Sequence, residues 1–246
     1  MKKIILIILA IFCISCSQET TDADVSNNFN TDGKGGSLAR FTLKGDYLYT
    51  VDEFDLNVFN ISDPDQPVFV NKQVIGFAIE TLFGYKDYLY IGSQNGMFIY
   101  DVKNPEFPKQ LSAVQHFTAC DPVVANDTHA FVTLQNSSGC GGTVNQLEVY
   151  NVEDVTKPIL VNTRRLTFPK GLGLYKNYLI LCDDKIKVFD ISDPENSVLV
   201  TSLDRLAFDV IIQDDLLIAI GEKGLYQYQL NPSQIDHIET LSSIDF

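Results

Sequence analysis

Five charged residues recur at nearly even intervals along the chain, and they are the side chains best placed to do chemistry. They are Arg40, Glu80, Asp121, Lys170 and Asp209, spaced 40, 41, 49 and 39 residues apart. If each occupies the same position in a repeated unit arranged around an axis, the five side chains form one ring. Three carboxylates and two cations in such a confined space would perturb one another's pKa values, as groups in ligand sites often do.

The ring has several chemical interpretations. Its opposite charges can satisfy one another as salt bridges that fix the spacing of the repeated units, or they can bind a ligand. A metal bound by Glu80, Asp121 and Asp209 is a further alternative, but Arg40 and Lys170 disfavour a hard cation there. We therefore predict no metal and no cofactor, and treat the ring as a candidate ligand site.

Hydrolysis is the enzymatic alternative for the same carboxylates. Paired acids cleave glycosidic bonds, one as proton donor and the other as nucleophile or base. The chain has no Trp to line a sugar site, and its repeats leave few long loops from which to build substrate subsites. We favour a ligand- or protein-binding or scaffolding module over a carbohydrate-active or other hydrolytic enzyme, and assign no catalytic residue.

Three cysteines lie beyond the N-terminal leader and predict a disulfide. Cys140 stands in a Ser/Gly-rich loop at residues 134–145, which accounts for the greater length of the third repeat. Cys120 starts the first strand of that repeat, on the same face. A Cys120–Cys140 bond would close a ring of about 21 residues and add roughly 3 kcal/mol in the chain-entropy model. Cys182 is expected on the same side, and three cysteines allow three pairings.

A recurring motif positions these residues. It reads Tyr-Leu-Tyr, a short turn, then an aromatic residue, an aliphatic residue and Asp-Pro, as in residues 47–64 and 88–105. The aromatic residues before the Asp-Pro turn are 41, 50, 39 and 39 residues apart; they are Phe59, Tyr100, Tyr150, Phe189 and Tyr228. Repeats of about 40 residues are typical of propeller blades and similar arrays.

Each repeat contains four short segments rich in Val, Ile, Tyr and Phe, separated by Asp, Asn, Gly and Pro. In the first repeat they cover residues 38–43, 47–52, 57–61 and 68–74. Five such units closed in a ring bury both faces of every sheet. We predict an all-β, five-bladed β-propeller whose blades cover about 37–75, 76–115, 116–166, 167–204 and 205–246. The first strand of each blade lines the channel, no strand is exchanged between the chain ends, and closure depends on packing between the terminal blades.

The N-terminus predicts export. Lys2 and Lys3 precede an apolar run at residues 4–14, which has the length of a signal-peptide core and is too short to span a bilayer. Ser15-Cys16 follows and resembles a lipobox, although Cys13 replaces the usual Leu. We expect a lipoprotein signal peptide at 1–15, acylation of Cys16 and a polar tether at 16–36. The expected location is the outer membrane, facing the periplasm or the cell surface.

Charge excludes one class of partner. Without Lys2 and Lys3, 32 acids face 16 bases, a net charge of −16. A chain this acidic repels phosphate backbones, and no basic stripe offsets that repulsion. We expect no nucleic-acid binding. The expected partners are a membrane, through the N-terminal lipid, and an envelope protein or glycan ligand.

Several phrases in the repeats carry a family resemblance. They are residues 39–42, 45–50, 58–64, 119–124 and 171–173, among them Gly45-Asp46-Tyr47-Leu48-Tyr49-Thr50 and Val58-Phe59-Asn60-Ile61-Ser62-Asp63-Pro64. As a set they resemble the LVIVD-repeat proteins, and the resemblance covers nearly all of the chain after the tether. It implies a β-propeller fold and an exported lipoprotein of the kind found in Bacteroidetes-type bacteria. It implies no particular reaction.

Overall fold

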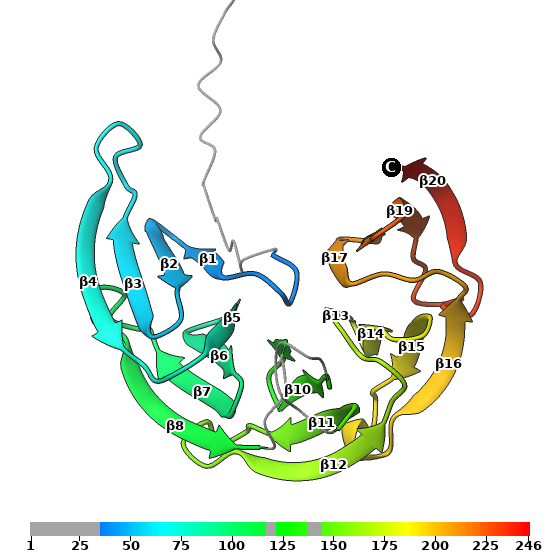
Figure 1. Ribbon diagram of the computed structural model, residues 1–246, viewed down its shortest axis with the longest axis horizontal. Coiled ribbons are helices and arrows are strands. Elements are labelled where there is room, and N and C mark those ends of the chain that lie inside the picture. Colours follow the sequence, from blue (N-terminus) through cyan, green and yellow to red (C-terminus); the bar gives the residue numbers. More distant parts are fainter. Residues whose placement is uncertain (1–34, 117–121, 137–143) are drawn as a thin grey trace, which may run out of the picture.

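The computed structural model describes residues 35–116, 122–136 and 144–246, and these form five four-stranded antiparallel sheets arranged as the blades of a β-propeller (Figure 1). Within each blade the strands follow the order of the sequence, from the centre of the arc to its outside. Among the described residues, no strand is exchanged between the two ends. The all-β, five-bladed prediction is therefore confirmed.

The strands are short, as their spacing predicts. Blade 1 contains β1 (Phe41–Lys44), β2 (Tyr47–Val51), β3 (Asp55–Asn60) and β4 (Val68–Val74). Blade 2 contains β5 (Ile79–Tyr85), β6 (Tyr88–Ser93), β7 (Gly96–Asp101) and β8 (Lys109–Gln115). Blade 3 contains β9 (Val123–Ala125), β10 (His129–Leu134), β11 (Gln146–Asn151) and β12 (Ile159–Arg165). Blade 4 contains β13 (Leu172–Tyr175), β14 (Tyr178–Cys182), β15 (Ile186–Asp190), the 3-10 turn η1 (Pro194–Asn196) and β16 (Val198–Leu203). Blade 5 contains β17 (Asp209–Gln213), β18 (Leu216–Gly221), β19 (Gly224–Gln229) and β20 (Glu239–Asp245).

The core lies between blades. Because side chains alternate across a strand, each blade has a leading face toward the next blade and a trailing face toward the preceding one. Tyr49 on the leading face of blade 1, for example, packs with Leu89 and Tyr100 on the trailing face of blade 2. Four such apolar clusters join the five blades in sequence.

The ring does not close as the sequence predicts. Figure 1 shows a gap between blade 1 and blade 5. Phe41 and Leu43 on the trailing face of blade 1 are exposed, by 60% and 42%, and the two terminal blades share none of the four apolar clusters. The expectation that packing between the terminal blades closes the ring is wrong. The physical reason is that the packing of each interface fixes the angle between consecutive blades, and four such angles leave part of the circle empty.

Candidate functional site

A cavity of about 430 Å³ lies where the inner ends of all five blades meet. Blades 1 and 2 contribute Arg40 and Glu80, and blade 4 contributes Lys170. The full lining is Leu38, Arg40, Glu80, Thr81, Pro122, Gln135, Lys170 and Phe208. Three members of the predicted charged ring therefore lie in one cavity, which we call the channel cavity.

Arg40 and Glu80 are joined through the main chain. Arg40 lies just before β1, and its Nε donates a hydrogen bond to the carbonyl oxygen of Glu80 at 3.1 Å. The Glu80 carboxylate accepts a hydrogen bond from Gln94 Nε2 at 2.9 Å. Both residues also line a smaller neighbouring cavity of about 250 Å³, together with Glu53 and Phe77. The guanidinium is thus oriented at the cavity wall by a neutral carbonyl.

Lys170 is held rigidly through its backbone. Its N–H donates to the carbonyl of Cys182 at 2.8 Å, and its carbonyl accepts a hydrogen bond from Thr133 Oγ1 at 2.6 Å. The ammonium lies 5.3 Å from the centre of the Phe168 ring, a cation–π contact. Because main chain and ring fix the residue from both sides, the Lys170 ammonium has a defined position at the cavity wall.

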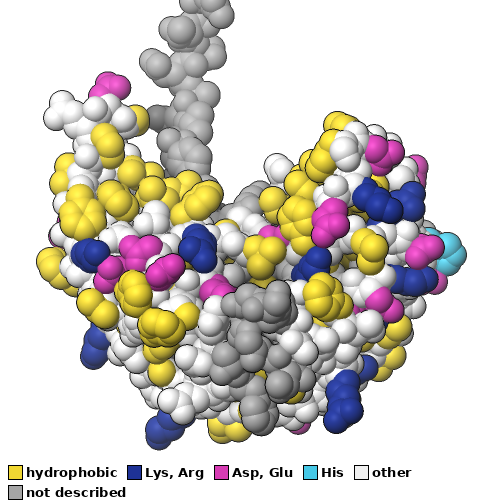
Figure 2. Space-filling view, in the orientation of Figure 1, with side chains coloured by type: hydrophobic (Ala, Val, Ile, Leu, Met, Phe, Trp, Pro, Cys, Tyr) yellow, Lys and Arg dark blue, Asp and Glu magenta, His cyan; other side chains and the backbone are white. Residues whose placement is uncertain are grey.

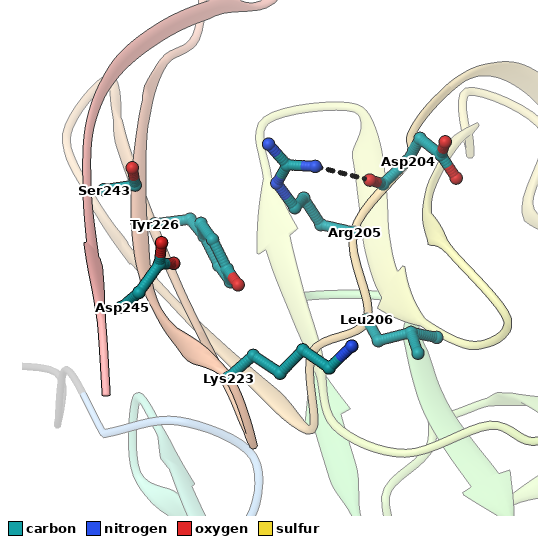
Figure 3. Close-up of a pocket in the computed structure, with 7 residues that line it drawn as sticks. All are labelled: Asp204, Arg205, Leu206, Lys223, Tyr226, Ser243 and Asp245. Carbon is teal, nitrogen blue, oxygen red and sulfur yellow. Dashed lines mark hydrogen bonds between the residues drawn. The ribbon is translucent and has the colours of Figure 1, made fainter.

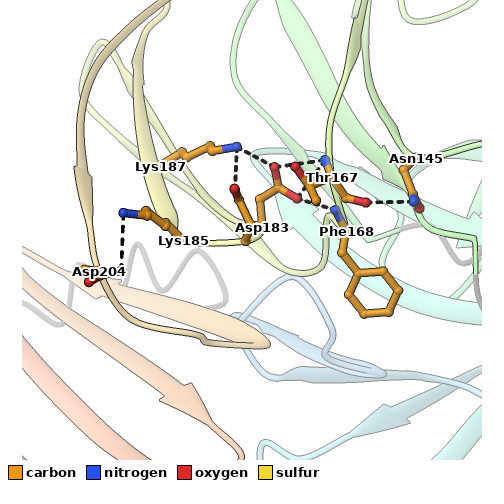
Figure 4. Close-up of polar contacts among 8 residues, drawn as sticks. Asn145, Thr167, Phe168, Asp183, Lys185, Lys187 and Asp204 are labelled. Carbon is orange, nitrogen blue, oxygen red and sulfur yellow. Dashed lines mark hydrogen bonds and ion pairs between the residues drawn. The ribbon is translucent and has the colours of Figure 1, made fainter.

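Sequence analysis did not identify Asp183, the residue that positions the segment before Lys170. Its side chain is fully buried and accepts hydrogen bonds from the backbone N–H groups of Thr167, at 3.0 Å, and Phe168 (Figure 4). Lys187 balances the buried charge, with its Nζ 2.7 Å from Asp183 Oδ2. The Cys-Asp-Asp sequence that begins at the last residue of β14 was the available signal, because a carboxylate beside a buried strand needs hydrogen-bond donors.

Asp209 has a different role from the other ring members. Its carboxylate accepts hydrogen bonds from Ser37 Oγ at 3.0 Å and from the Leu38 N–H at 3.2 Å, and it is not among the residues that line the channel cavity. Burial raises the pKa of this carboxyl, while the backbone N–H of Val210, 2.9 Å from Oδ1, acts in the opposite direction. Asp209 thus fastens the segment before blade 1 to blade 5.

Two chain segments approach the Asp209 carboxylate closely, and each does so through a glycine. A Cβ on Gly36 would lie 2.2 Å from Asp209 Oδ2, and a Cβ on Gly171 would lie 2.1 Å from Oδ1. Gly171 begins the Gly-Leu-Gly sequence at the start of blade 4. Only glycine leaves space for the carboxylate between these two segments.

Other predicted residues lie outside the described part of the chain. These are Cys16, Cys120, Asp121 and Cys140, so the lipid site, the disulfide and the place of Asp121 in the ring stay predictions. Cys182 is described: it is a free thiol, fully buried between blades 4 and 5, and burial raises its pKa.

The described residues hold neither a cluster of metal ligands nor a membrane-spanning helix. They contain no group of three or more His, Cys, Asp or Glu side chains that could hold a metal ion. Across the same residues, no helix has the length and apolar character needed to cross a bilayer.

A larger cavity of about 520 Å³ lies beside blade 5 (Figure 3). Arg205 and Lys223 line it together with Asp204 and Asp245, and Arg205 lies 5.4 Å from the centre of the Tyr226 ring. Among the described residues that line it, two cations and two carboxylates balance, and all belong to the last blade or to the segment leading to it. The channel cavity, which draws on every blade, is therefore the better candidate site.

Solved structures support the fold. A functionally unknown protein from Desulfotomaculum acetoxidans matches with a TM-score of 0.70 at 10% identity, over 84% of this chain and 69% of that one. A protein from Lactobacillus plantarum matches with a TM-score of 0.67 at 10% identity, over 80% and 67%. The periplasmic gluconolactonase PpgL from Pseudomonas aeruginosa matches with a TM-score of 0.61 at 14% identity, over 82% and 68%. At these identities the likeness concerns the fold alone.

The sequence comparisons concern the repeats. No curated protein matches the chain. The family model described as LVIVD repeat matches residues 35–72 and 85–114, which lie in blades 1 and 2. The same four-stranded unit occurs five times in the structure. The chain therefore contains LVIVD repeats and has the fold of a five-bladed β-propeller.

Proposed function

We propose that this protein is a binding module of the cell envelope and that the channel cavity holds a small organic anion. The observation that carries the proposal is the charge of the cavity. The whole chain has a net charge of −14, yet the described lining has two cations, Arg40 and Lys170, against the single carboxylate of Glu80. A local reversal of sign in a confined space concentrates anions.

The remaining lining suits the body of such a ligand. Leu38, Pro122 and Phe208 offer apolar contacts, while Thr81 and Gln135 offer hydrogen-bonding groups. Binding sites for small molecules combine this kind of apolar wall with a few convergent polar groups. A small molecule matches these features if it has a carboxylate or phosphate near Arg40 and Lys170 and a hydroxylated chain of a few carbons.

The hydrolytic alternative has less support from the described carboxylates. Hydrolysis of a glycosidic bond needs two acids facing one substrate. Asp209 is engaged by Ser37 and Leu38, whereas Glu80 lines the cavity. These two do not form such a pair, which is why we favour binding without turnover.

Calorimetric titration with gluconate, phosphate and neutral glucose tests the ligand class. We expect saturable binding of at least one anion and none of glucose. Arg40→Gln and Lys170→Gln should each weaken anion binding at least tenfold, because each removes one of two cations. Arg205→Gln and Lys223→Gln, in the cavity beside blade 5, are matched controls and should change nothing. Anion binding that persists in the Arg40→Gln, Lys170→Gln double variant would place the site elsewhere.

Membrane anchoring through Cys16 is the second part of the proposal. The apolar run at residues 4–14 and the Ser15-Cys16 sequence support it, and the polar tether would let the propeller move away from the bilayer surface. Intact-mass measurement of the protein from a bacterial host should show acyl chains. Cys16→Ser should move the protein from the detergent phase to the aqueous phase, whereas Cys13→Ser should leave it in the detergent phase. An unmodified mass for the wild type would reject this part alone.

A further inference from the structure

The gap between the terminal blades has two apolar walls. Its first wall is the trailing face of blade 1, formed by Phe41, Leu43, Leu48 and Phe59; its second is the leading face of blade 5, formed by Ile211, Ile218, Ile220 and Leu225. Figure 2 shows a notch here with hydrophobic side chains on both sides. We call this gap the slot.

Equivalent positions in the other blades show what the slot lacks. Ile218 corresponds to Tyr49, Tyr90, Phe131 and Ile180, which are at most 1% exposed, yet Ile218 is only half-buried. Leu48 corresponds to Leu89, Ala130, Leu179 and Leu217, which are also at most 1% exposed, and it too is half-buried. The slot thus presents both halves of an interface that is complete at four other places in the molecule.

The two walls cannot meet by a small movement of the blades. Closing the arc would change the angle at all four packed interfaces, whose central side chains are buried and interlocked. Closely packed cores do not deform continuously, so such a change would break their contacts. An occupant of the slot therefore has to come from outside the five blades.

The charges at one rim of the slot indicate what kind of occupant fits. Three packed interfaces carry a Lys–Asp ion pair at or beside the turns that join the first two strands of neighbouring blades; these pairs are Lys44–Asp87, Lys86–Asp127 and Lys176–Asp215. Blade 5 has Asp214 where blades 2 and 4 have Lys86 and Lys176, in the same left-handed backbone conformation. Blade 1 has Asp46 where blades 2 and 5 have Asp87 and Asp215. Both edges of the slot are therefore acidic.

The acidic edges disfavour two candidate occupants. A second copy of this chain that joined a leading face to a trailing face would place Asp214 against Asp46, and like charges repel. The tether at residues 16–36 is also unsuited, because it holds four acids, one base and few large apolar residues.

At the outer edge of the slot, a hydrogen-bonding side chain has no neighbouring blade to bond to. In three packed interfaces a polar side chain on the fourth strand donates to a carbonyl of the next blade, in the connection between its third and fourth strands. These bonds are Asn71 to Glu106, Ser112 to Val155 and Asn162 to Glu195. The equivalent residue of blade 5, Ser242, donates instead to Gln227 of its own blade, at 2.8 Å.

From these observations we infer that the slot is a docking site for a β-sheet segment of a partner protein, apolar on both faces and basic at the turn beside Asp46 and Asp214. Its trailing face packs on Ile218 and Leu225, and its leading face packs on Leu48 and Phe59. Its basic turn replaces the lysines that the packed interfaces have. Ser242 is released to donate to a carbonyl of the docked segment.

A synthetic hairpin tests the inference against the full-length protein. The probe copies residues 86–101, the two central strands of blade 2, which pack on both neighbouring blades. Its basic form carries D87K, and its acidic form carries K86E. Fluorescence anisotropy at low salt should show the basic form binding about tenfold more tightly, with the preference lost at 1 M salt. The Asp46→Lys, Asp214→Lys double variant should invert the preference.

Further variants distinguish the slot from other surfaces. Phe41→Asp and Ile218→Asp should abolish binding of both hairpins, while Ile159→Asp, an equally exposed position on β12, should not affect it. All slot variants should retain anion binding in the channel cavity, which separates this inference from the proposed function. Failure of the native protein to bind either hairpin would overturn it. So would a wild-type dimer in light scattering that Phe41→Asp dissociates, since a second copy would then occupy the slot.

Discussion

The four packed interfaces and the slot are built from the same repeated sequence, yet only the packed interfaces are buried. Phe131, between blades 3 and 4, is completely buried, whereas Phe41, on the open face of blade 1, is 60% exposed. Both aromatic residues lie in the inner strands of a blade. The difference teaches that an apolar residue of the repeat stabilises the fold only where a neighbouring blade covers it. The contribution of a repeat to the free energy of unfolding therefore depends on its position in the arc.

The largest expected contrast is between these two aromatic residues. Phe131→Ala should lower the free energy of unfolding by about 3–5 kcal/mol, because it leaves a cavity between two blades. Phe41→Ala should change it by less than about 1 kcal/mol, because little surface is recovered from water. Urea unfolding of the two variants measures both. Similar losses in both would show that blade 1 is covered in solution.

A smaller loss is expected at the joint between blades 4 and 5. Gly171→Ala would place a Cβ 2.1 Å from Asp209 Oδ1 and 2.8 Å from Asp209 Cα, so backbone must shift, at a cost of about 1–3 kcal/mol. Gly45→Asn at the slot is the matched control: nothing lies within 4 Å of a Cβ there, and Asn tolerates its φ of +52°. Thermal unfolding should separate the two, and an unperturbed Gly171→Ala would indicate that Asp209 is free to move away.

The pH dependence should have opposite signs at Asp209 and Asp215. Burial raises the pKa of Asp209, so its contribution to stability is present below the unfolded-state pKa and is lost as pH rises through the folded-state value. The hydrogen bond from Tyr175 lowers the pKa of Asp215, so its contribution is present at neutral pH and is lost as pH falls through the folded-state value.

Urea unfolding between pH 7 and pH 4 measures this difference. As pH falls, the wild type should gain stability relative to Asp209→Asn and lose it relative to Asp215→Asn. Parallel trends for the two variants would contradict the assigned burial of the Asp209 carboxylate.

The smallest effect is expected from the charged turns. Lys86→Asp should lower the Tm by about 1–3 °C at low salt, because two carboxylates would then meet at a packed interface. Asp214→Lys should leave the Tm unchanged, because no blade stands opposite it. Both effects are screened at high salt. Stabilisation by Asp214→Lys would indicate that blades 1 and 5 approach each other after all.

Much of the fold could be predicted from the repeat. The Tyr-Leu-Tyr and Asp-Pro motifs set the strands and their order, because alternation and turn chemistry are local properties. The charged ring was predicted only in part: Arg40, Glu80 and Lys170 line one cavity, but Asp209 binds Ser37 and Leu38. The spacing is off by one residue at Asp209: Phe208, not Asp209, has the backbone position that Lys170 has in blade 4, and neighbouring residues of a strand point to opposite faces. Asp183 has a counterpart in Asp52 of the first repeat, but Ser93, Leu134 and Gly221 stand at that position in the others, so the repeat did not single it out.

The sequence by itself determined the strands, the number of blades and the residues that face each neighbour, since these follow from a period of two along a strand and of about 40 along the chain. Only the tertiary structure decided that the arc stays open, that the channel cavity collects Arg40 and Lys170, and that no other described part of the chain covers the walls of the slot. These features depend on the angle at which packed sheets meet. That angle results from side-chain packing summed over whole interfaces, which no local pattern records.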